Sequence, residues 1–505
     1  MALALGVKTR HKDYDKYAPK WKRARDVVAG QDAVHTAGTA YLDLLANEDP
    51  VEYLKRVRRT PFFNASFRTV ASFVGMLFRK PPTLEVPKQL EPLLEDVTMS
   101  GVSFENLAQN CAYEDFTTSW LGIYVDHPAQ VQKKDGTPLT LAEAELLGLR
   151  PSMTLYGAEA IRNWEYRRIN NKRVLSRVRL DEIKTERKSE FESEEVKVIR
   201  VLDLEEETNL YRVRVFKEDT EEQIGDDVYP LMNGQRLDFI PFYFIGPDGT
   251  DGTLEDPILI DLFDHNIKHY QVSADYEHAC HMTALPTPWV TGYQTEMGAD
   301  GAPVKTEFYI GSTTAWVFPD PNTKVGYLEF EGSGIQAIKE NLDGKKEELA
   351  ALGARALTPE KAGVESQGAL IIRNTGEHSI LGAAANAISG GLLKALQTFA
   401  KWAGIAGEIK FAINRDFIPF NIDPAALTGW MAAVQAGLMS QETFFDLIKR
   451  GDLVDQAITF EEEQARIDAN PPMPAPVAGG TGEGQDNPDD KPEGQPGQGG
   501  GSGEE

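Results

Sequence analysis

The order of hydrophobic and polar positions predicts helices and a block of strands in the first half of the chain. From Val51 to Arg79 the apolar residues recur at helical spacing, and Pro81-Pro82 ends the pattern. Phe104 to Trp120 is again helical, and "WLGIYVDHP" after it predicts a strand that runs into a turn. Between Val174 and Phe216 apolar residues alternate with charged ones, which is typical of antiparallel strands with one solvent-exposed face.

Two further segments complete this β-rich block. "MNGQ" at 232–235 predicts a tight turn, and "FIPFYFIG" at 239–246 predicts a buried strand. A β-rich unit inside a mostly helical chain indicates an α+β fold.

Longer helices follow in the second half. Asp256-Pro257 has the form of an N-cap with proline at the first helical position, and the helix is expected to reach about Met282. Strand-like segments occupy 286–330. Ser333-Gly-Ile-Gln336 is a capping-box pattern that opens a second helix, expected to reach residue 357. "ALTPEKAGVESQ" interrupts the pattern before a long helix over Gln367 to Ala403.

The remaining elements are shorter. "EIKFAINRDF" predicts a strand, Asp423-Pro424 opens another helix, and Ser440 is expected to cap the last helix. Residues 470–505 carry seven acidic residues against Lys491, a charge of −6, with much Pro, Gly and Gln. Such a segment buries too little apolar surface to offset its ordering entropy, so a disordered acidic tail is expected and the folded part ends near 469.

Length and composition limit the class of protein. A chain of 505 residues predicts two to four structural units. We expect no membrane span, because no run of 18 apolar residues occurs, and the N-terminus does not have the pattern of a signal peptide. Cys111 and Cys280 are too few for a disulfide framework.

The net charge argues against a surface that grips nucleic acid. The chain has 52 basic and 78 acidic residues, a net charge of −26, so most of its surface is expected to repel DNA. Basic residues do gather near the N-terminus, where they form either a solvated helix face or a phosphate-contacting patch. They are Lys16, Lys20, Lys22, Arg23, Arg25, Lys55, Arg56, Arg58 and Arg59.

Histidines gather in "DLFDHNIKHYQVSADYEHACHM" (261–282), which raises the question of a metal site. At about 100° per residue, His278 and His281 extend the apolar packing stripe, whereas His265 and His269 lie elsewhere. Because a zinc site needs three or four convergent ligands, and no other His/Cys cluster exists, no metal ligands are expected. A third face of this helix is polar and mostly acidic; it holds Asp261, Asp264, Lys268, Gln271 and Asp275.

Signatures of catalysis are missing from the sequence. It contains no G-x-x-x-x-G-K-[ST], no G-x-S-x-G and no H-E-x-x-H. We therefore expect no enzymatic activity, no catalytic residues and no cofactor.

Several segments, taken in order, resemble tailed-bacteriophage portal proteins, the head-to-tail connectors, in a branch catalogued as a domain of unknown function. "YAPKWKRARDVVAGQDAV", "YLDLL" and "NASFRTVASFVGMLFRKPP" resemble the opening of that family. "YGAEAIRNWEYRRIN" resembles its entry into the β block, and the segment from "IPFYFIG" through "DPILIDLFDHNIKHY" resembles the passage into its first stem helix. "GLMSQETFFDLIKRGDLV" resembles its C-terminal helical segment, so the resemblance covers most of 14–454.

This resemblance implies a dodecameric ring at one capsid vertex, around an axial channel for double-stranded DNA. It also implies partners, namely the terminase large subunit, a head-tail adaptor, and capsid and scaffold proteins, with assembly in the host cytoplasm and a final place in the virion. The implied regions are a wing (1–256), stem helix 1 (257–283), a clip (284–332), stem helix 2 (333–357), a tunnel loop (358–367), a long wing helix and strand (368–422), crown-like helices (423–469) and the tail (470–505).

Three sets of residues follow as hypotheses. Arg355, Lys361, Lys345 and Lys346 are candidates for DNA contacts in the channel; Asp261, Asp264 and Asp275 for an acidic channel face; and Ile335, Ile338, Leu342, Leu349 and Leu352 for subunit packing. Two other functions stay open at this point. One is a non-catalytic scaffold or interaction protein, and the other is a metal-dependent hydrolase that uses the His265–His281 stretch.

Overall fold

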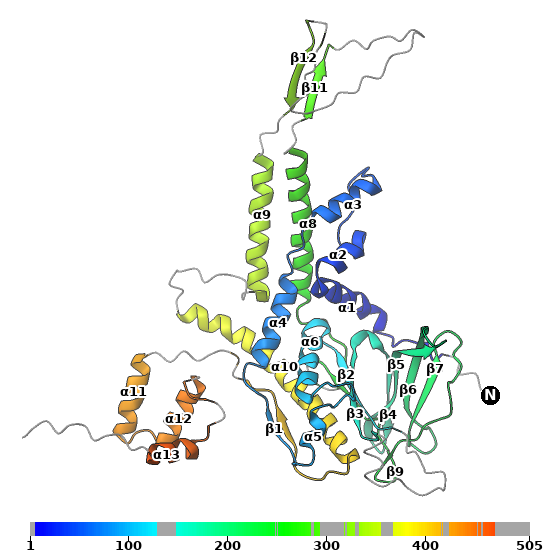
Figure 1. The fold of residues 1–505 in the computed structure, drawn as a ribbon, viewed down its shortest axis with the longest axis vertical. Coiled ribbons are helices and arrows are strands. Elements are labelled where there is room, and N and C mark those ends of the chain that lie inside the picture. Colours follow the sequence, from blue (N-terminus) through cyan, green and yellow to red (C-terminus); the bar gives the residue numbers. More distant parts are fainter. Residues whose placement is uncertain are drawn as a thin grey trace, which may run out of the picture. The chain divides into compact units, whose positions relative to one another are not determined.

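The computed structural model describes residues 6–128, 148–247, 249, 251–283, 287–292, 318, 321–328, 333–354, 367–415, 417, 424–451, 453–455 and 458–469. Two units are present, Met1–Ile418 and Pro419–Glu505. Helices and several small sheets make up the fold, which is α+β as predicted (Figure 1). Within the described residues no helix combines the length and hydrophobicity needed to cross a bilayer.

The N-terminal helices are shorter than the sequence pattern indicated. They are α1 (Tyr14–Ala29), α2 (Gln31–Ala37), the 3₁₀ turn η1 (Gly38–Ala40), α3 (Pro50–Arg59) and α4 (Ala65–Leu77). The helical pattern predicted over Val51 to Arg79 corresponds to two helices, α3 and α4, because Pro61 interrupts it. Each helix has its own cap: Asp49 accepts a hydrogen bond from Val51 N, and Asn64 accepts one from Phe67 N.

A helix and a small sheet form the centre of the first unit. The elements are β1 (Thr83–Glu85), α5 (Glu91–Leu94), α6 (Phe104–Thr118), β2 (Leu121–Asp126), β3 (Ser152–Gly157) and β10 (Phe242–Ile245). β2 lies between β10 and β3, antiparallel to both. The predicted helix at 104–120 and the predicted strands at 120 and 239–246 are therefore confirmed.

The predicted antiparallel block is a four-stranded meander. It consists of β4 (Ile161–Ile169), which follows the 3₁₀ turn η2 (Ala158–Ala160), then β5 (Lys172–Arg187), β6 (Ser193–Leu204) and β7 (Tyr211–Lys217), in that order. β8 (Leu231–Met232) and β9 (Gln235–Arg236) form the hairpin predicted at "MNGQ". Asn233 and Gly234 have φ of 52° and 77°, the left-handed values that a two-residue turn of this kind needs.

The longest helices come next along the chain. α8 (Ile260–Thr283) leads through β11 (Thr287–Thr291) and β12 (Lys324–Leu328) to α9 (Ser333–Leu349), a π-helical turn η3 (Ala350–Ala354) and α10 (Gln367–Trp402) (Figure 1). α8 begins later than predicted, since Asp256 pairs with Lys20 of α1 instead of capping a helix. The second helix of the pair ends at Leu349, where the π turn replaces the expected α-helix.

One continuous core holds the helices and both larger sheets of the first unit together. Trp21 of α1 stacks on Trp120 at 6.0 Å between ring centroids, with both side chains almost fully buried. α10 packs closely on β10, because a Cβ added at Gly391 would lie 2.3 Å from Cγ1 of Ile245. β13 (Lys410–Ala412) then pairs with β1.

The second unit contains three described helices, α11 (Pro424–Gln435), α12 (Gln441–Arg450) and α13 (Phe460–Ala469). Ser440 caps α12 by accepting a hydrogen bond from Thr443 N, as predicted. The expectation that this helix is the last one is wrong, because α13 follows it. The acidic segment 470–505 lies outside the described residues.

Candidate functional site

The antiparallel helix pair α8–α9 is the element on which the function predicted from the sequence depends. α8 is 24 residues long and α9 is 17 residues long, and the two helices pack along each other (Figure 1). The β11–β12 hairpin lies between them in the chain, at the position expected for a clip. Most of the remaining segment between the helices lies outside the described residues.

The polar face predicted on α8 is exposed, but part of its charge is compensated. Asp261, Asp264 and Asp275 all reach solvent. Asp264 pairs with Arg23 of α1 at 3.0 Å, so its negative charge has an internal partner. Lys268 donates a hydrogen bond to Gln271 on the same face at 3.2 Å. A role of this face in a channel stays a prediction.

The histidines of α8 are placed differently from the sequence prediction. His269 is 3% exposed and contacts Phe63 at 5.6 Å between ring centroids, and no described residue bonds its ring nitrogens. Burial, followed by the nearby charge of Lys346, lowers the pKa of His269 to about 4. His281, by contrast, is exposed. The predicted packing role of His281 is therefore wrong, whereas His278 is half-buried and its Nδ1 is shielded from solvent. Because α8 has neighbours on more than one side, a projection of this helix alone did not indicate that His269 is buried.

His265 has a partner on the other helix of the pair. Its Nε2 bonds to Oε2 of Glu348 on α9, and Lys345 donates to the same oxygen at 2.7 Å. His265 therefore contacts α9, whereas His269 packs against Phe63, so the two imidazoles do not converge on one point. Among the described residues no group of three or more His, Cys, Asp or Glu side chains has an arrangement that would hold a metal ion.

The five residues predicted to pack between subunits, called the α9 seam below, include both buried and exposed side chains. Leu342 and Leu349 are 9% and 1% exposed, so both are already covered within one chain. Ile335 and Ile338 are half-buried, and Leu352, in the π turn, is 41% exposed. If the seam also packs against a neighbouring subunit, these last three positions provide the remaining contact surface.

Of the four cationic residues assigned to DNA contacts, two can be placed. Lys345 is held by Glu348, and Lys346 pairs with Asp343 at 3.6 Å with its side chain 46% exposed. Arg355 and Lys361 lie outside the described residues, as does the loop 358–366 that would carry Lys361. The DNA role of all four residues stays a prediction.

The basic residues near the N-terminus mostly have acidic partners, which favours a structural role over a phosphate-contacting patch. Arg25 bonds Glu114 and Glu159, and Arg56 bonds Glu48. Lys20, Lys22, Arg23 and Lys55 pair with Asp256, Asp26, Asp264 and Glu52. A cleft of about 520 Å³ between α1, η1 and α8 is lined partly by Lys22 and Arg23, whose charges are thus compensated.

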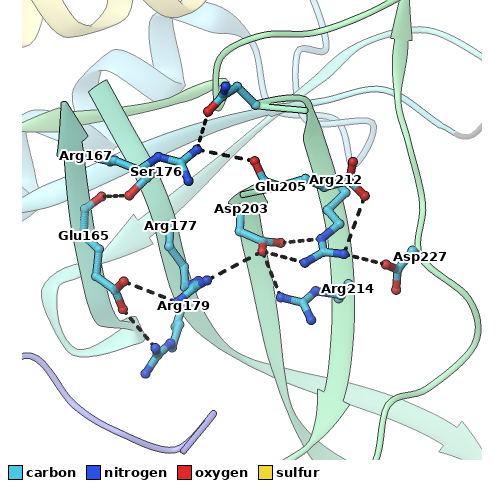
Figure 2. A network of polar contacts seen from close by, with 11 residues as sticks. Glu165, Arg167, Ser176, Arg177, Arg179, Asp203, Glu205, Arg212, Arg214 and Asp227 are labelled. Atoms are coloured by element: carbon cyan, nitrogen blue, oxygen red, sulfur yellow. Dashed lines mark hydrogen bonds and ion pairs between the residues drawn. The ribbon is translucent and has the colours of Figure 1, made fainter. Parts of the chain in front are cut away.

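The polar face of the four-stranded sheet carries an ion-pair network that sequence reasoning missed (Figure 2). Asp203 of β6 is 1% exposed and accepts hydrogen bonds from Arg212 at 3.1 and 3.2 Å and from Arg214 at 2.9 Å. Glu165 of β4 accepts from Arg177 at 3.3 Å and Arg179 at 3.0 Å on β5. The network joins all four strands, and Arg179 also donates to the carbonyls of Gly6 and Thr9. It stabilises the sheet and fixes the N-terminal segment, and its cations already have partners.

Two buried titratable groups lie on α6. Burial alone raises the pKa of Asp115 to about 7, and neither of its carboxylate oxygens has a hydrogen-bond partner among the described residues. Burial also raises the pKa of the Cys111 thiol, which makes it unreactive. No pattern in the sequence distinguishes Asp115 from an ordinary surface carboxylate.

Comparisons with known proteins give two kinds of match. Residues 258–403, which span the α8–α9 pair and α10, match a family described as "Domain of unknown function (DUF4055)". No curated protein matches the chain.

Solved structures also resemble it. A chain of the virion of a native gene transfer agent particle matches with 11% identity and a TM-score of 0.39, covering 82% of this chain and 98% of that one. A chain of the neck of the native particle, computed with C12 symmetry, matches with 12% identity and a TM-score of 0.37, covering 82% and 97%. A neck chain of the empty particle, computed with C6 symmetry, matches with 11% identity and a TM-score of 0.38.

Proposed function

We propose that this chain is a portal protein, a subunit of a ring at the unique vertex of a tailed-phage or phage-like capsid. The ring is a conduit through which double-stranded DNA is packaged and ejected. It is also the docking platform for the terminase large subunit and the head-tail adaptor, and it contacts capsid and scaffold proteins during assembly. The chain takes no part in catalysis and belongs to the virion.

The observation that carries this proposal is the order of elements from α8 to α10. A long helix, a β hairpin, a second long helix, an irregular turn and a third long helix follow one another in the order that the resemblance implies for stem, clip, stem, tunnel loop and wing helix. The exposed acidic positions on α8 agree with a wall past which DNA slides, since a wall that attracted phosphates would hold the duplex.

Electron microscopy and mass measurement of the purified chain test the proposal. Closed rings of about twelve copies of the 55.9 kDa chain are expected, each with an axial hole. A preparation that stays monomeric at micromolar concentration in physiological salt would exclude a portal and favour a non-catalytic scaffold protein. Because the ring would be strongly acidic, the measurement is repeated in low and in high salt, where screening favours assembly.

A further inference from the structure

α3 presents an outward face that combines large apolar side chains with positive charge. Val51 and Leu54 are 59% and 52% exposed. At about 100° per residue, Lys55 and Arg58 lie on the same side of the helix, opposite the buried Tyr53. Arg58 is exposed and, within the part of the chain that the structure describes, has no ion-pair partner. Val51, Leu54, Lys55 and Arg58 are called the α3 patch below.

The α3 patch is held in a fixed position by buried contacts on the other side of the helix. Arg56, 3% exposed, donates to both carboxylate oxygens of Glu48 and to the carbonyl of Asp43 at 2.7 Å each. The Tyr53 hydroxyl donates to the carbonyl of Leu42 at 3.0 Å. A rigid surface loses little conformational entropy when a partner covers it, which favours binding. Val51 and Leu54 lie about one turn apart on this fixed surface, so a partner that covers one side chain also reaches the other.

The outward face of α9 has the opposite character. Its seam, centred on Leu342, faces α8, and at about 100° per residue Ala337, Glu340, Gly344 and Glu347 lie on the far side. Glu340 and Glu347 are exposed and, among the described residues, neither has an ion-pair partner. The positions between them are small, and a Cβ added at Gly344 would meet no atom within 4 Å. These four residues, called the α9 stripe, form a shallow acidic surface.

The helices α3 and α9 lie on opposite flanks of α8 (Figure 1). His265 of α8 bonds Glu348 of α9, whereas Tyr270 contacts Phe62, just beyond α3, at 5.9 Å between ring centroids. Around the axis of α8, His265 and Tyr270 point in directions that differ by about 140°. The exposed Asp275 points about a quarter turn away from His265, on the side opposite to Tyr270. The acidic face of α8 therefore lies between the two flanks, where it contacts α1 through the Asp264–Arg23 pair.

We infer that the α3 patch of one subunit packs against the α9 stripe of the next, an inference that rests on the ring proposed above. A closed ring needs a heterologous interface, in which each subunit offers two different complementary surfaces on its two flanks. The α3 patch and the α9 stripe meet this requirement in charge and in shape. Arg58 faces Glu340 and Glu347, while Leu54 fills the space beside Gly344. The acidic face of α8, between the two flanks, then points to neither neighbour.

Charge reversal tests this interface. The full-length variants Arg58→Glu and Glu340→Lys/Glu347→Lys are each expected to lower the fraction of chain in rings about tenfold, because like charges then face each other. The variant that combines all three substitutions restores attraction and is expected to recover the rings. Lys172→Glu, at an exposed position of β5, changes the charge by the same amount as Arg58→Glu, so it serves as the control for that variant and leaves assembly unchanged. Thermal unfolding of each variant confirms that the subunit is folded.

Cysteine trapping gives a second, independent measurement. In Leu54→Cys/Gly344→Cys, mild oxidation is expected to link successive subunits into a ladder of multimers, whereas Leu54→Cys alone yields no ladder. Wild-type chains that never form rings would contradict the proposed function itself. Wild-type rings combined with charge variants that assemble normally, or with no ladder in the double-cysteine variant, would overturn the α3–α9 interface and leave the portal proposal intact.

Discussion

Arg56 of α3 and Glu48 of the preceding loop form a two-point ion pair inside the protein. Nε and Nη2 of the guanidinium each donate to one carboxylate oxygen at 2.7 Å, and the two side chains are 3% and 7% exposed. Because so little water reaches the pair, each charge depends on the other for its stabilisation.

Replacing Arg56 by Ala is expected to lower the free energy of unfolding by about 3 kcal/mol, because Glu48 is left buried without its partner. The hydrogen bond from Arg56 holds the pKa of Glu48 below its ordinary 4.5, so the pair contributes stability above pH 4.5 that is lost as pH falls. Denaturant unfolding from pH 3 to pH 7 measures both effects. Lys55→Ala, which removes the exposed Lys55–Glu52 pair, should cost under about 1 kcal/mol. If Arg56→Ala and Lys55→Ala lowered the free energy of unfolding equally, the Arg56–Glu48 pair would not be a buried, mutually dependent pair.

Asp115 should make the protein less stable as pH rises toward neutrality. Burial raises its pKa from 3.8 to about 7, so the folded state holds a proton that the unfolded state releases. The stability is present below about pH 3.8 and is lost as pH rises through about 7, by about 4 kcal/mol in total. Asp115→Asn is expected to be more stable than wild type at pH 8 and nearly equal at pH 4. The free energy of unfolding is measured against pH for both proteins and for Asp238→Asn, a control at an exposed position. If Asp115→Asn and Asp238→Asn gave the same pH dependence, the raised pKa of Asp115 would be ruled out.

His269 should make the protein less stable as pH falls, which is the opposite of the effect of Asp115. Its pKa is lowered from 6.5 to about 4, mainly by burial, so the unfolded chain takes up a proton that the folded chain rejects. The stability present above pH 6.5 is lost as pH falls to 4, by about 2 kcal/mol after allowance for solvent screening. His269→Leu is expected to remove this loss, whereas His281→Gln at an exposed position keeps it. A wild-type pH profile in His269→Leu would show that the imidazole is solvated.

No metal is expected at stoichiometric occupancy on α8, since His265 and His269 are engaged separately by Glu348 and by the apolar surroundings of Phe63. Elemental analysis of full-length protein purified without an affinity tag measures this. If one zinc per chain were found, and it were lost when both histidines are changed to Ala, α8 would bind a metal and the metal-dependent hydrolase would become the favoured function.

Two cations that follow the π turn in the sequence give a functional test. Arg355→Ala/Lys361→Ala is expected to leave ring assembly unchanged and to reduce DNA packaging or retention of packaged DNA, because transient phosphate contacts in the channel are removed. Packaged DNA per particle is compared with that of Lys172→Ala/Lys184→Ala, a matched loss of two positive charges at exposed positions of β5. Heads that fill and keep their DNA at the wild-type level would show that these two residues are not channel contacts.

Regular local patterns predicted much of the fold. Alternation between Val174 and Phe216 was sufficient for three strands, because period two reports a sheet face directly. Ser440 was identified as a cap because its signal is local. Asp256 carried the same signal and failed as a cap, because its side chain pairs with Lys20, which is 236 positions away in the sequence.

The site was predicted less well, for a physical reason. Which side of α8 is buried depends on Phe63 and on α9, neither of which lies near His269 in the sequence. Likewise, Asp203 follows the alternating pattern of an exposed residue, yet arginines on both neighbouring strands cover it. Burial of a polar side chain is decided by tertiary neighbours, and a single sequence does not name them.

The π turn that ends α9 has a mechanical consequence. An α-helix resists axial compression through its unbroken ladder of hydrogen bonds, and α8 extends that ladder over 24 residues. α9 ends instead in Ala350–Ala354, where Gly353 has φ of 140° and departs from helical geometry. The helical hydrogen-bond ladder is thus continuous in α8 and interrupted at Gly353 after α9, so we expect the pair to bend first at Gly353 under a load along its axis.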